Sequence, residues 1–121
     1  MEQPLILVVE DNFDTRSAVQ WLLQREGFNV VVAVDGEAAL RILGQIHPDL
    51  IIADLTMPFV DGFELIRQLR ETEKFAALPI VVLSAYVDGY LDEVKGCGAT
   101  AVLRKPEDLF TLAETVRQLL R

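Results

Sequence analysis

The chain of 121 residues is 51% hydrophobic and 25% charged, which excludes intrinsic disorder and fits a single domain over residues 1–121. Eleven basic against nineteen acidic residues give a net charge of −8, so we expect no direct DNA binding, because contacts to phosphates depend on Lys and Arg. The single cysteine excludes an internal disulfide, and the apolar runs are too short for a signal peptide or for membrane insertion, so we expect a cytoplasmic protein.

Five short apolar runs predict five strands. They are rich in Val and Ile and continuous rather than alternating, which is typical of strands buried on both faces of a parallel sheet. The segments between them exceed the roughly twelve residues that a parallel crossover needs. The expected strands are residues 5–9, 30–34, 50–53, 80–83 and 101–103.

A segment with helical spacing of apolar residues follows each strand. Gly27 and Gly44 are expected to end the first two helices, and Asp61 is expected to cap the third. The fourth helix, over residues 88–95, is weakly patterned, because it contains Gly89 and an interior glycine costs about 1 kcal/mol relative to alanine. The expected inward faces are Ala18, Val19, Leu22 and Leu23; Ala39, Leu40 and Leu43; Leu65, Ile66 and Leu69; and, in a last helix from Glu107, Leu109, Leu112, Val116 and Leu119.

This alternation predicts an α/β fold with a doubly wound parallel sheet and helices on both faces. Both common strand orders of such sheets bind ligands beyond the carboxyl ends of the strands. Taken alone, each polar residue at a strand end is more often a helix cap or a solvated loop residue. Together they would bring carboxylates, a hydroxyl and an ammonium group to one edge of the sheet: Glu10, Asp11, Asp54, Ser84 and Lys105.

Three carboxylates at close quarters repel one another, and a hard cation such as Mg²⁺ would compensate that repulsion. Mg²⁺ together with one Lys suits phosphoryl transfer, in which a carboxylate can act as the nucleophile. The glycine-rich motifs of dinucleotide-binding and P-loop proteins are missing. The sole histidine, His47, precedes Pro48 and is interpreted as a loop residue, which argues against a Ser-His-Asp triad.

Five motifs, in the same order and at the same spacing, resemble the receiver domain of bacterial two-component response regulators. The motifs are ILVVEDN (6–12), PDLIIADLTMP (48–58), DGFEL (61–65), PIVVLSA (79–85), and GA (98–99) leading to KP (105–106). The resemblance covers essentially the whole chain. It implies the CheY-like, flavodoxin-like arrangement of five parallel strands in the order 2-1-3-4-5.

The resemblance also implies roles for individual residues. Asp54 would accept the phosphoryl group, Lys105 would pair with a phosphoryl oxygen, and Ser84 would donate its hydroxyl to another. The Lys105–Pro106 bond would be the family's cis peptide, against about 5–6% of X–Pro bonds in general. The Mg²⁺ ligands would be Glu10, Asp11, Asp54 and the backbone carbonyl of Thr56.

The implied activity is phosphorelay signalling. A histidine kinase or phosphotransfer protein would phosphorylate Asp54, and this would switch the face formed by the fourth helix, fifth strand and fifth helix, and so the binding of a downstream protein. The protein would not be an enzyme beyond catalysing its own phosphorylation and dephosphorylation. Whether the chain acts alone or belongs to a larger regulator or hybrid kinase stays open.

One position departs from the family pattern. Val102 occupies a place that is usually aromatic, which puts the transmission of the signal in doubt. Tyr86 has two interpretations, a gate for water or a loop aromatic, and by helical phase Trp21 and Tyr90 are expected at the surface.

Two other functions compete with a phosphorylated switch. A pseudo-receiver that acts as an interaction module without phosphorylation fits Val102, but the intact set of five polar residues argues against it. A small phosphatase or phosphotransferase lacks a general acid at the expected place.

Overall fold

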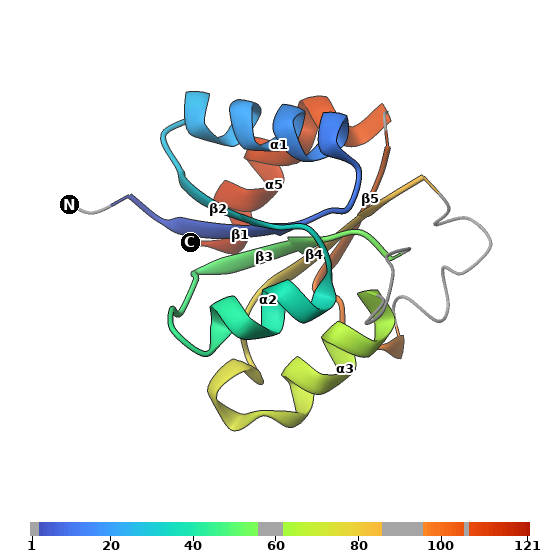
Figure 1. Cartoon of the computed structure of the whole chain (residues 1–121). Coiled ribbons are helices and arrows are strands. Elements are labelled where there is room, and N and C mark those ends of the chain that lie inside the picture. The colour runs from blue at the N-terminus through green and yellow to red at the C-terminus, as the bar shows by residue number, and fades with distance from the viewer. Residues whose placement is uncertain (1–2, 56–61, 86–95, 106) are drawn as a thin grey trace.

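Five parallel strands form one sheet in the order β2-β1-β3-β4-β5, which confirms the expected order (Figure 1). The computed structural model describes residues 3–55, 62–85, 96–105 and 107–121. Because every strand runs in the same direction, all five carboxyl ends meet at one edge of the sheet. The strands are β1 (Leu5–Val9), β2 (Asn29–Ala33), β3 (Leu50–Ala53), β4 (Ile80–Ser84) and β5 (Ala101–Arg104).

Helices cover both faces of the sheet. In Figure 1, α1 and α5 lie on one face, and α2 and α3 lie on the other. The α-helices are α1 (Phe13–Arg25), α2 (Gly36–Leu43), α3 (Gly62–Glu71) and α5 (Leu112–Leu119), and the short 3₁₀ helices are η1 (Glu73–Phe75) and η3 (Glu107–Thr111). Within the described ranges, none of these helices has the length and apolar character needed to cross a membrane.

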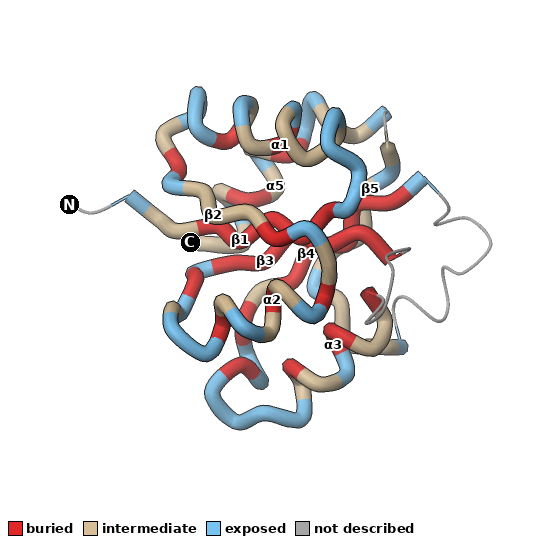
Figure 2. The backbone as a smooth tube through the Cα atoms, viewed as in Figure 1, coloured by how far each residue is buried: buried red, intermediate tan, exposed pale blue. Residues whose placement is uncertain are grey.

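The sheet divides the core into two apolar layers. Alternate residues of β1 point to opposite layers: Leu7 and Val9 pack with α2 and α3, and Ile6 and Val8 pack with α1 and α5. The central strands β1, β3 and β4 are buried almost throughout, whereas the edge strands β2 and β5 are half-buried (Figure 2). The continuous apolar runs of the central strands therefore have the cause expected from the sequence.

Three sequence predictions need correction. β2 begins at Asn29, whose N–H donates to the carbonyl of Pro4, and ends before Val34, which is 50% exposed. Ala18 is exposed, although Val19 and Leu23 on the same helix are buried as expected. The expected ends of the first two helices, by contrast, are confirmed. Gly27 follows α1 with φ +95°, and Gly44 caps the end of α2.

The third correction concerns the last helix. From Glu107 the chain first forms η3, and α-helical geometry begins only at Leu112. The carboxylate of Asp108 accepts from the backbone N–H of Arg104, and the hydroxyl of Thr111 donates to the carbonyl of Asp108. Such local side-chain bonds compete with the α-helical ladder. The expected fourth helix (88–95) and the Asp61 cap lie outside the described residues.

Candidate functional site

Backbone hydrogen bonds of the sheet hold three of the expected site residues. Each residue stands at the carboxyl end of a strand and continues its ladder. The N–H of Glu10 donates to the carbonyl of Ala33 (3.0 Å), and the N–H of Asp54 donates to the carbonyl of Val9 (3.1 Å). The N–H of Lys105 donates to the carbonyl of Ser84 (3.2 Å). The rigid sheet thus sets where these side chains begin.

The side chains meet as the sequence predicts. Carboxylate oxygens of Glu10, Asp11 and Asp54 lie within 4.8 Å of one another. Glu10 is 4% exposed and Asp54 is 8% exposed, whereas Asp11 is open to solvent. Lys105 reaches into this cluster, with its Nζ 2.5 Å from Oε1 of Glu10 and 3.5 Å from Oδ2 of Asp54.

The charges of this cluster do not balance. Among the described residues, three carboxylates form the cluster, and Lys105 makes ion pairs with two of them, Glu10 and Asp54. The pKa of Glu10 is raised to about 7, chiefly by burial and also by the nearby Asp54, although the hydrogen bond from Lys105 opposes the rise. The site therefore favours an additional positive charge.

The donor set fits a magnesium ion. Three carboxylates from two adjacent strand ends offer hard oxygen ligands, and Asp11 keeps the site open to water, which Mg²⁺ retains in its shell. A cation held there would relieve the repulsion that disfavours the ionised form of Glu10. The expected fourth ligand, the carbonyl of Thr56, lies outside the described residues.

Of the other residues singled out from the sequence, some are described by the structure and some lie outside its described ranges. Ser84 is fully buried at the carboxyl end of β4, and Val102 is half-buried on β5, beside Val82 in register. Trp21 is 58% exposed, as expected. Tyr86, Tyr90 and the Lys105–Pro106 bond rest on residues outside the described ranges.

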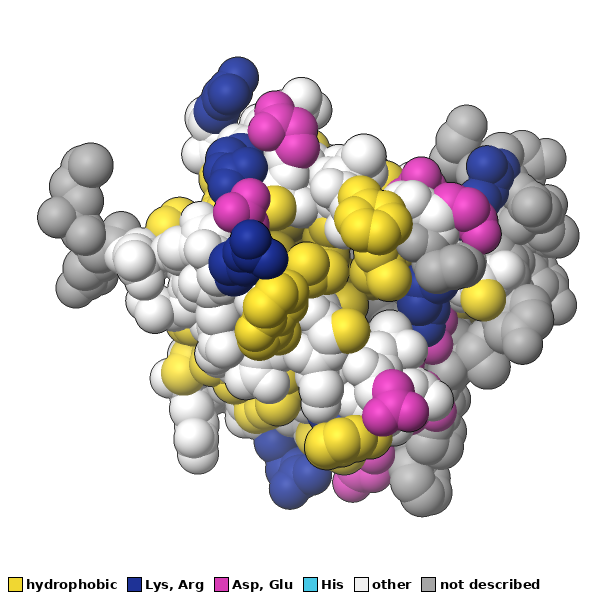
Figure 3. Space-filling view, turned by 90° about the horizontal axis from the view of Figure 1, so that it is seen from above, with side chains coloured by type: hydrophobic (Ala, Val, Ile, Leu, Met, Phe, Trp, Pro, Cys, Tyr) yellow, Lys and Arg dark blue, Asp and Glu magenta, His cyan; other side chains and the backbone are white. Residues whose placement is uncertain are grey.

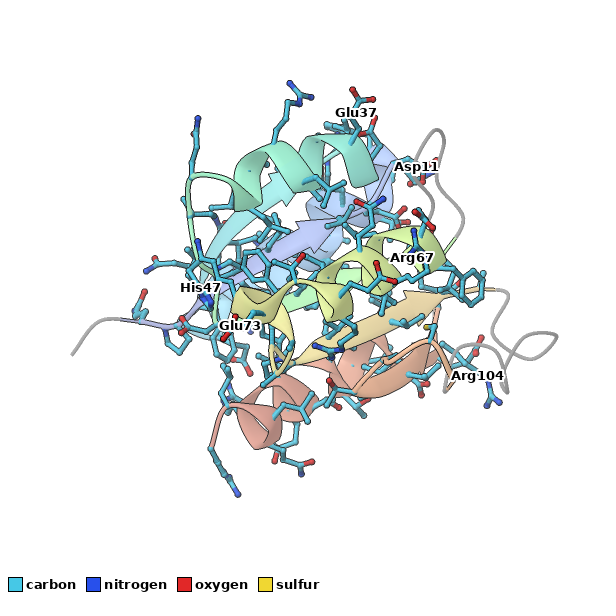
Figure 4. All side chains as sticks on the ribbon, turned by 90° about the horizontal axis from the view of Figure 1, so that it is seen from below. Asp11, Glu37, His47, Arg67, Glu73 and Arg104 are labelled. Atoms are coloured by element: carbon cyan, nitrogen blue, oxygen red, sulfur yellow. The ribbon has the colours of Figure 1, made fainter. Side chains whose placement is uncertain are left out.

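His47 lies far from the acidic cluster. In Figure 4, Asp11 and Arg104 lie at one end of the sheet, whereas His47 and Glu73 lie at the other. The ring nitrogens of His47 lie 3.0 Å from the carbonyl of Pro48 and 3.3 Å from that of Lys74. The interpretation of His47 as a loop residue is confirmed.

Sequence reasoning assigned no role to two residues that contact the site backbone. Arg16 on α1 donates to the carbonyl of Glu10, and Gly62 packs directly on the peptide after Asp54. A Cβ built on Gly62 would lie 2.3 Å from the carbonyl oxygen of Asp54, which is closer than real structures allow. Only Arg16 had a sequence signal: a cation near a helix N-terminus runs against the helix dipole.

Comparison with known proteins agrees with this geometry. The response regulator receiver domain family matches the chain over residues 6–117. The transcriptional regulatory protein AfsQ1 of Streptomyces coelicolor is 38% identical over 120 residues, which cover 98% of this chain and 52% of AfsQ1. The chain spans about half the length of several such regulators that it matches.

Solved structures show the same fold. The chemotaxis protein CheY4 of Vibrio cholerae has a TM-score of 0.90 at 33% identity, with 98% of this chain and 99% of CheY4 covered. The response regulator TrrA of Thermotoga maritima, in complex with Mg²⁺-BeF, has a TM-score of 0.88 at 31% identity, with 98% of this chain and all of TrrA covered. The flavodoxin-like, CheY-like arrangement is thereby confirmed.

Proposed function

Because this chain belongs to the response regulator receiver domain family, we propose that Asp54 accepts a phosphoryl group and that this changes which proteins the chain binds. Members of the family are signalling modules of two-component systems rather than enzymes that turn over free substrates. The observation that carries the proposal is the meeting of Glu10, Asp11, Asp54 and Lys105 at the carboxyl edge of the sheet.

Asp54 supplies the nucleophile. One of its carboxylate oxygens forms a bond to phosphorus while the bond from phosphorus to the imidazole nitrogen of a phosphorylated histidine kinase or phosphotransfer protein breaks. The imidazole keeps the electron pair and takes a proton from water. Asp54 is 8% exposed, so its neighbours, rather than bulk water, set the electrostatics of this step.

Lys105 and Ser84 act on the phosphoryl oxygens. Lys105 already lies 3.5 Å from Oδ2 of Asp54, so its ammonium group needs only a small movement to pair with a phosphoryl oxygen bound there. Ser84, at the end of the neighbouring strand, donates its hydroxyl to a second oxygen. Both contacts become available only after transfer, and they therefore favour the switched conformation.

The acidic residues hold the cofactor. Glu10, Asp11 and Asp54, with the carbonyl of Thr56, would bind Mg²⁺, which the related TrrA structure contains with BeF. When bound, Mg²⁺ neutralises the charge that gathers on the carboxylates and phosphoryl oxygens. Asp11, the exposed member, would bind the ion directly, and the buried Glu10 would bind it through water.

The output is a change in protein binding at the face formed by the fourth helix, β5 and α5. Val102, on β5, has no ring to swing inward and is stiff at χ1, so the aromatic response that is usual at this position is missing. A downstream protein is the expected partner. The absence of direct DNA binding and a cytoplasmic location remain predictions for this chain.

Intact mass spectrometry tests the proposal. The purified chain is incubated with acetyl phosphate, with Mg²⁺ or with EDTA, beside the Asp54→Asn variant. We expect the wild-type chain to gain one phosphoryl group with Mg²⁺ but not with EDTA, and the Asp54→Asn variant to gain none. Intrinsic fluorescence of the exposed Trp21 reports on the accompanying conformational change.

Absence of both phosphorylation and Mg²⁺ binding in the folded protein would contradict the proposal. It would favour the pseudo-receiver, an alternative that the valine at position 102 also fits. Phosphorylation without a structural response would leave the chemistry intact and make Val102 the first position to change. Steady hydrolysis of a free phosphomonoester would instead support the phosphatase alternative.

A further inference from the structure

We propose that Arg16 is a positioning residue for the acidic site: it holds the backbone between Glu10 and Asp11 so that both carboxylates face a divalent cation. Its Nη1 donates to the carbonyl of Glu10 (3.0 Å) and lies 3.4 Å from the carbonyl of Asp11. These two carbonyls belong to the residues whose side chains form the acidic cluster. The inference rests on the proposed function, because it concerns the same site.

Other bonds hold the turn on either side of these carbonyls, and the N–H of Asn12 donates to the Glu10 carboxylate across it (3.3 Å). At the start of the turn, the N–H of Glu10 donates to the carbonyl of Ala33. At its end, the side chain of Asn12 caps α1 by accepting from the N–H of Thr15 (2.9 Å). Both ends of the turn are therefore fixed by the sheet and by the helix. The side chain of Arg16 fixes the two carbonyls between these ends.

An aromatic ring supports the Arg16 side chain. The guanidinium carbon lies 5.5 Å from the centroid of the Phe13 ring, one turn earlier on α1, although Phe13 is 68% exposed. A second arginine of the same helix has the same support, because Arg25 lies 5.2 Å from the centroid of Trp21. Figure 3 shows hydrophobic and basic side chains next to one another on the face that α1 and α5 form. Arg25 thus matches Arg16 in helix, charge and stacking.

The charge of Arg16 and its hydrogen bonds predict opposite effects on Mg²⁺ binding. A cation near a helix N-terminus opposes the helix dipole, and it repels a second cation bound at the neighbouring carboxylates. If Arg16 acted through charge alone, its removal would tighten Mg²⁺ binding. If Arg16 orients the ligands, its removal weakens Mg²⁺ binding. The two accounts predict opposite signs for one measurement.

Calorimetric titration of the full chain with Mg²⁺ distinguishes them. We expect Arg16→Gln to bind Mg²⁺ about tenfold more weakly than wild type, the lower end of the effect of losing a group that orients metal ligands. The matched control Arg25→Gln removes the same charge from the same helix and should bind Mg²⁺ like wild type. Amide NMR shifts of Asp11 and Asn12 should move in metal-free Arg16→Gln and stay in place in Arg25→Gln.

Two further variants should lower the affinity for Mg²⁺ by smaller amounts, and they serve as the test if Arg16→Gln folds poorly. Arg16→Lys keeps the charge but lacks the planar fork, and should bind Mg²⁺ with intermediate affinity. Phe13→Ala keeps the guanidinium but removes its support, and should weaken binding least. At saturating Mg²⁺, phosphorylation by acetyl phosphate should return close to the wild-type rate in all three variants.

Mg²⁺ binding by Arg16→Gln that equals or exceeds the wild-type affinity would overturn the inference, as would an equal loss in Arg25→Gln. Either result, with a wild-type chain that binds Mg²⁺ and is phosphorylated on Asp54, would leave the proposed function standing. A wild-type chain that does neither contradicts the proposed function itself.

Discussion

Polar side chains gather at both edges of the sheet, but they do so in different ways. At the amino edge, Arg70 of α3 ties the end of its helix to the segments that enter β4 and β5. Its guanidinium donates to backbone carbonyls and to the hydroxyl of Thr100, which in turn accepts from the N–H of Ile80 (3.0 Å). The carbonyl partners are those of Phe75, Ala76, Leu78 and Gly98, at 2.7–3.2 Å.

At the carboxyl edge, negative charge is in excess among the described residues. Glu10 and Asp54 are buried beside Asp11, and Lys105 compensates only part of their charge. The raised pKa of Glu10 expresses the same imbalance. At the amino edge the backbone supplies the hydrogen-bond acceptors for one guanidinium, which indicates a structural role. At the carboxyl edge several carboxylates crowd together and favour a bound cation, which indicates a functional site.

The largest expected effect on stability comes from the amino edge. Arg70→Met leaves backbone carbonyls without their charged donor and should lower the free energy of unfolding by about 3 kcal/mol, the upper range for hydrogen bonds to charged groups. Urea unfolding followed by circular dichroism measures this. The affinity for Mg²⁺ should stay unchanged.

The control for Arg70 lies three residues earlier on the same helix. Arg67 is exposed and pairs with Glu64 and Glu71, so Arg67→Met should lower the free energy of unfolding far less than Arg70→Met. Equal losses in the two variants would show that the amino edge owes its stability to helix α3 as a whole rather than to the Arg70 contacts.

Gly62 links the two edges, because α3 begins with Gly62 beside Asp54 and has Arg70 near its other end. Gly62→Ala places a Cβ against the carbonyl of Asp54 and should cost about 2 kcal/mol, as overpacking typically does. Because the backbone of the acceptor must shift, phosphorylation by acetyl phosphate should also slow.

Gly96→Ala is the matched control, since its Cβ would meet nothing within 4 Å. It should leave stability and phosphorylation unchanged. A Gly62→Ala protein that loses stability but accepts phosphoryl groups at the wild-type rate would separate the packing of α3 from the chemistry of Asp54.

The last expected effect on stability has the opposite sign. In EDTA, Glu10→Gln should stabilise the protein at pH 8, because it removes a buried charge whose ionised form is disfavoured. The folded pKa of Glu10 is about 7, above its ordinary value of 4.5, so its carboxylate costs stability as the pH rises through this window.

Unfolding midpoints at pH 4 and pH 8 test the sign. The stabilisation by Glu10→Gln should vanish at pH 4, and the exposed Glu37→Gln should show little effect at either pH. With Mg²⁺ present, Glu10→Gln should instead lose the stabilisation that Mg²⁺ binding confers on the wild type.

The sequence predicts the sheet and the members of the acidic cluster, because both follow from local patterns. Continuous apolar runs reveal buried strands, and parallel strands bring residues such as Glu10 and Asp54 to one edge. The late start of α5 was not predictable, since a side-chain bond from Asp108 to the backbone overrides the apolar spacing. The contacts of Arg70 with Gly98 and of Gly62 with Asp54 depend on how α3 packs, which no local pattern records.

The most direct test of the carboxyl edge as a phosphoryl-acceptor site is to map the modified residue. After incubation with acetyl phosphate and Mg²⁺, reduction with borohydride converts a phosphorylated aspartate into homoserine, which peptide mass spectrometry locates. Our account predicts homoserine at position 54 and an unmodified chain when EDTA replaces Mg²⁺. Homoserine at another aspartate, or modification at position 54 that is independent of Mg²⁺, would contradict it.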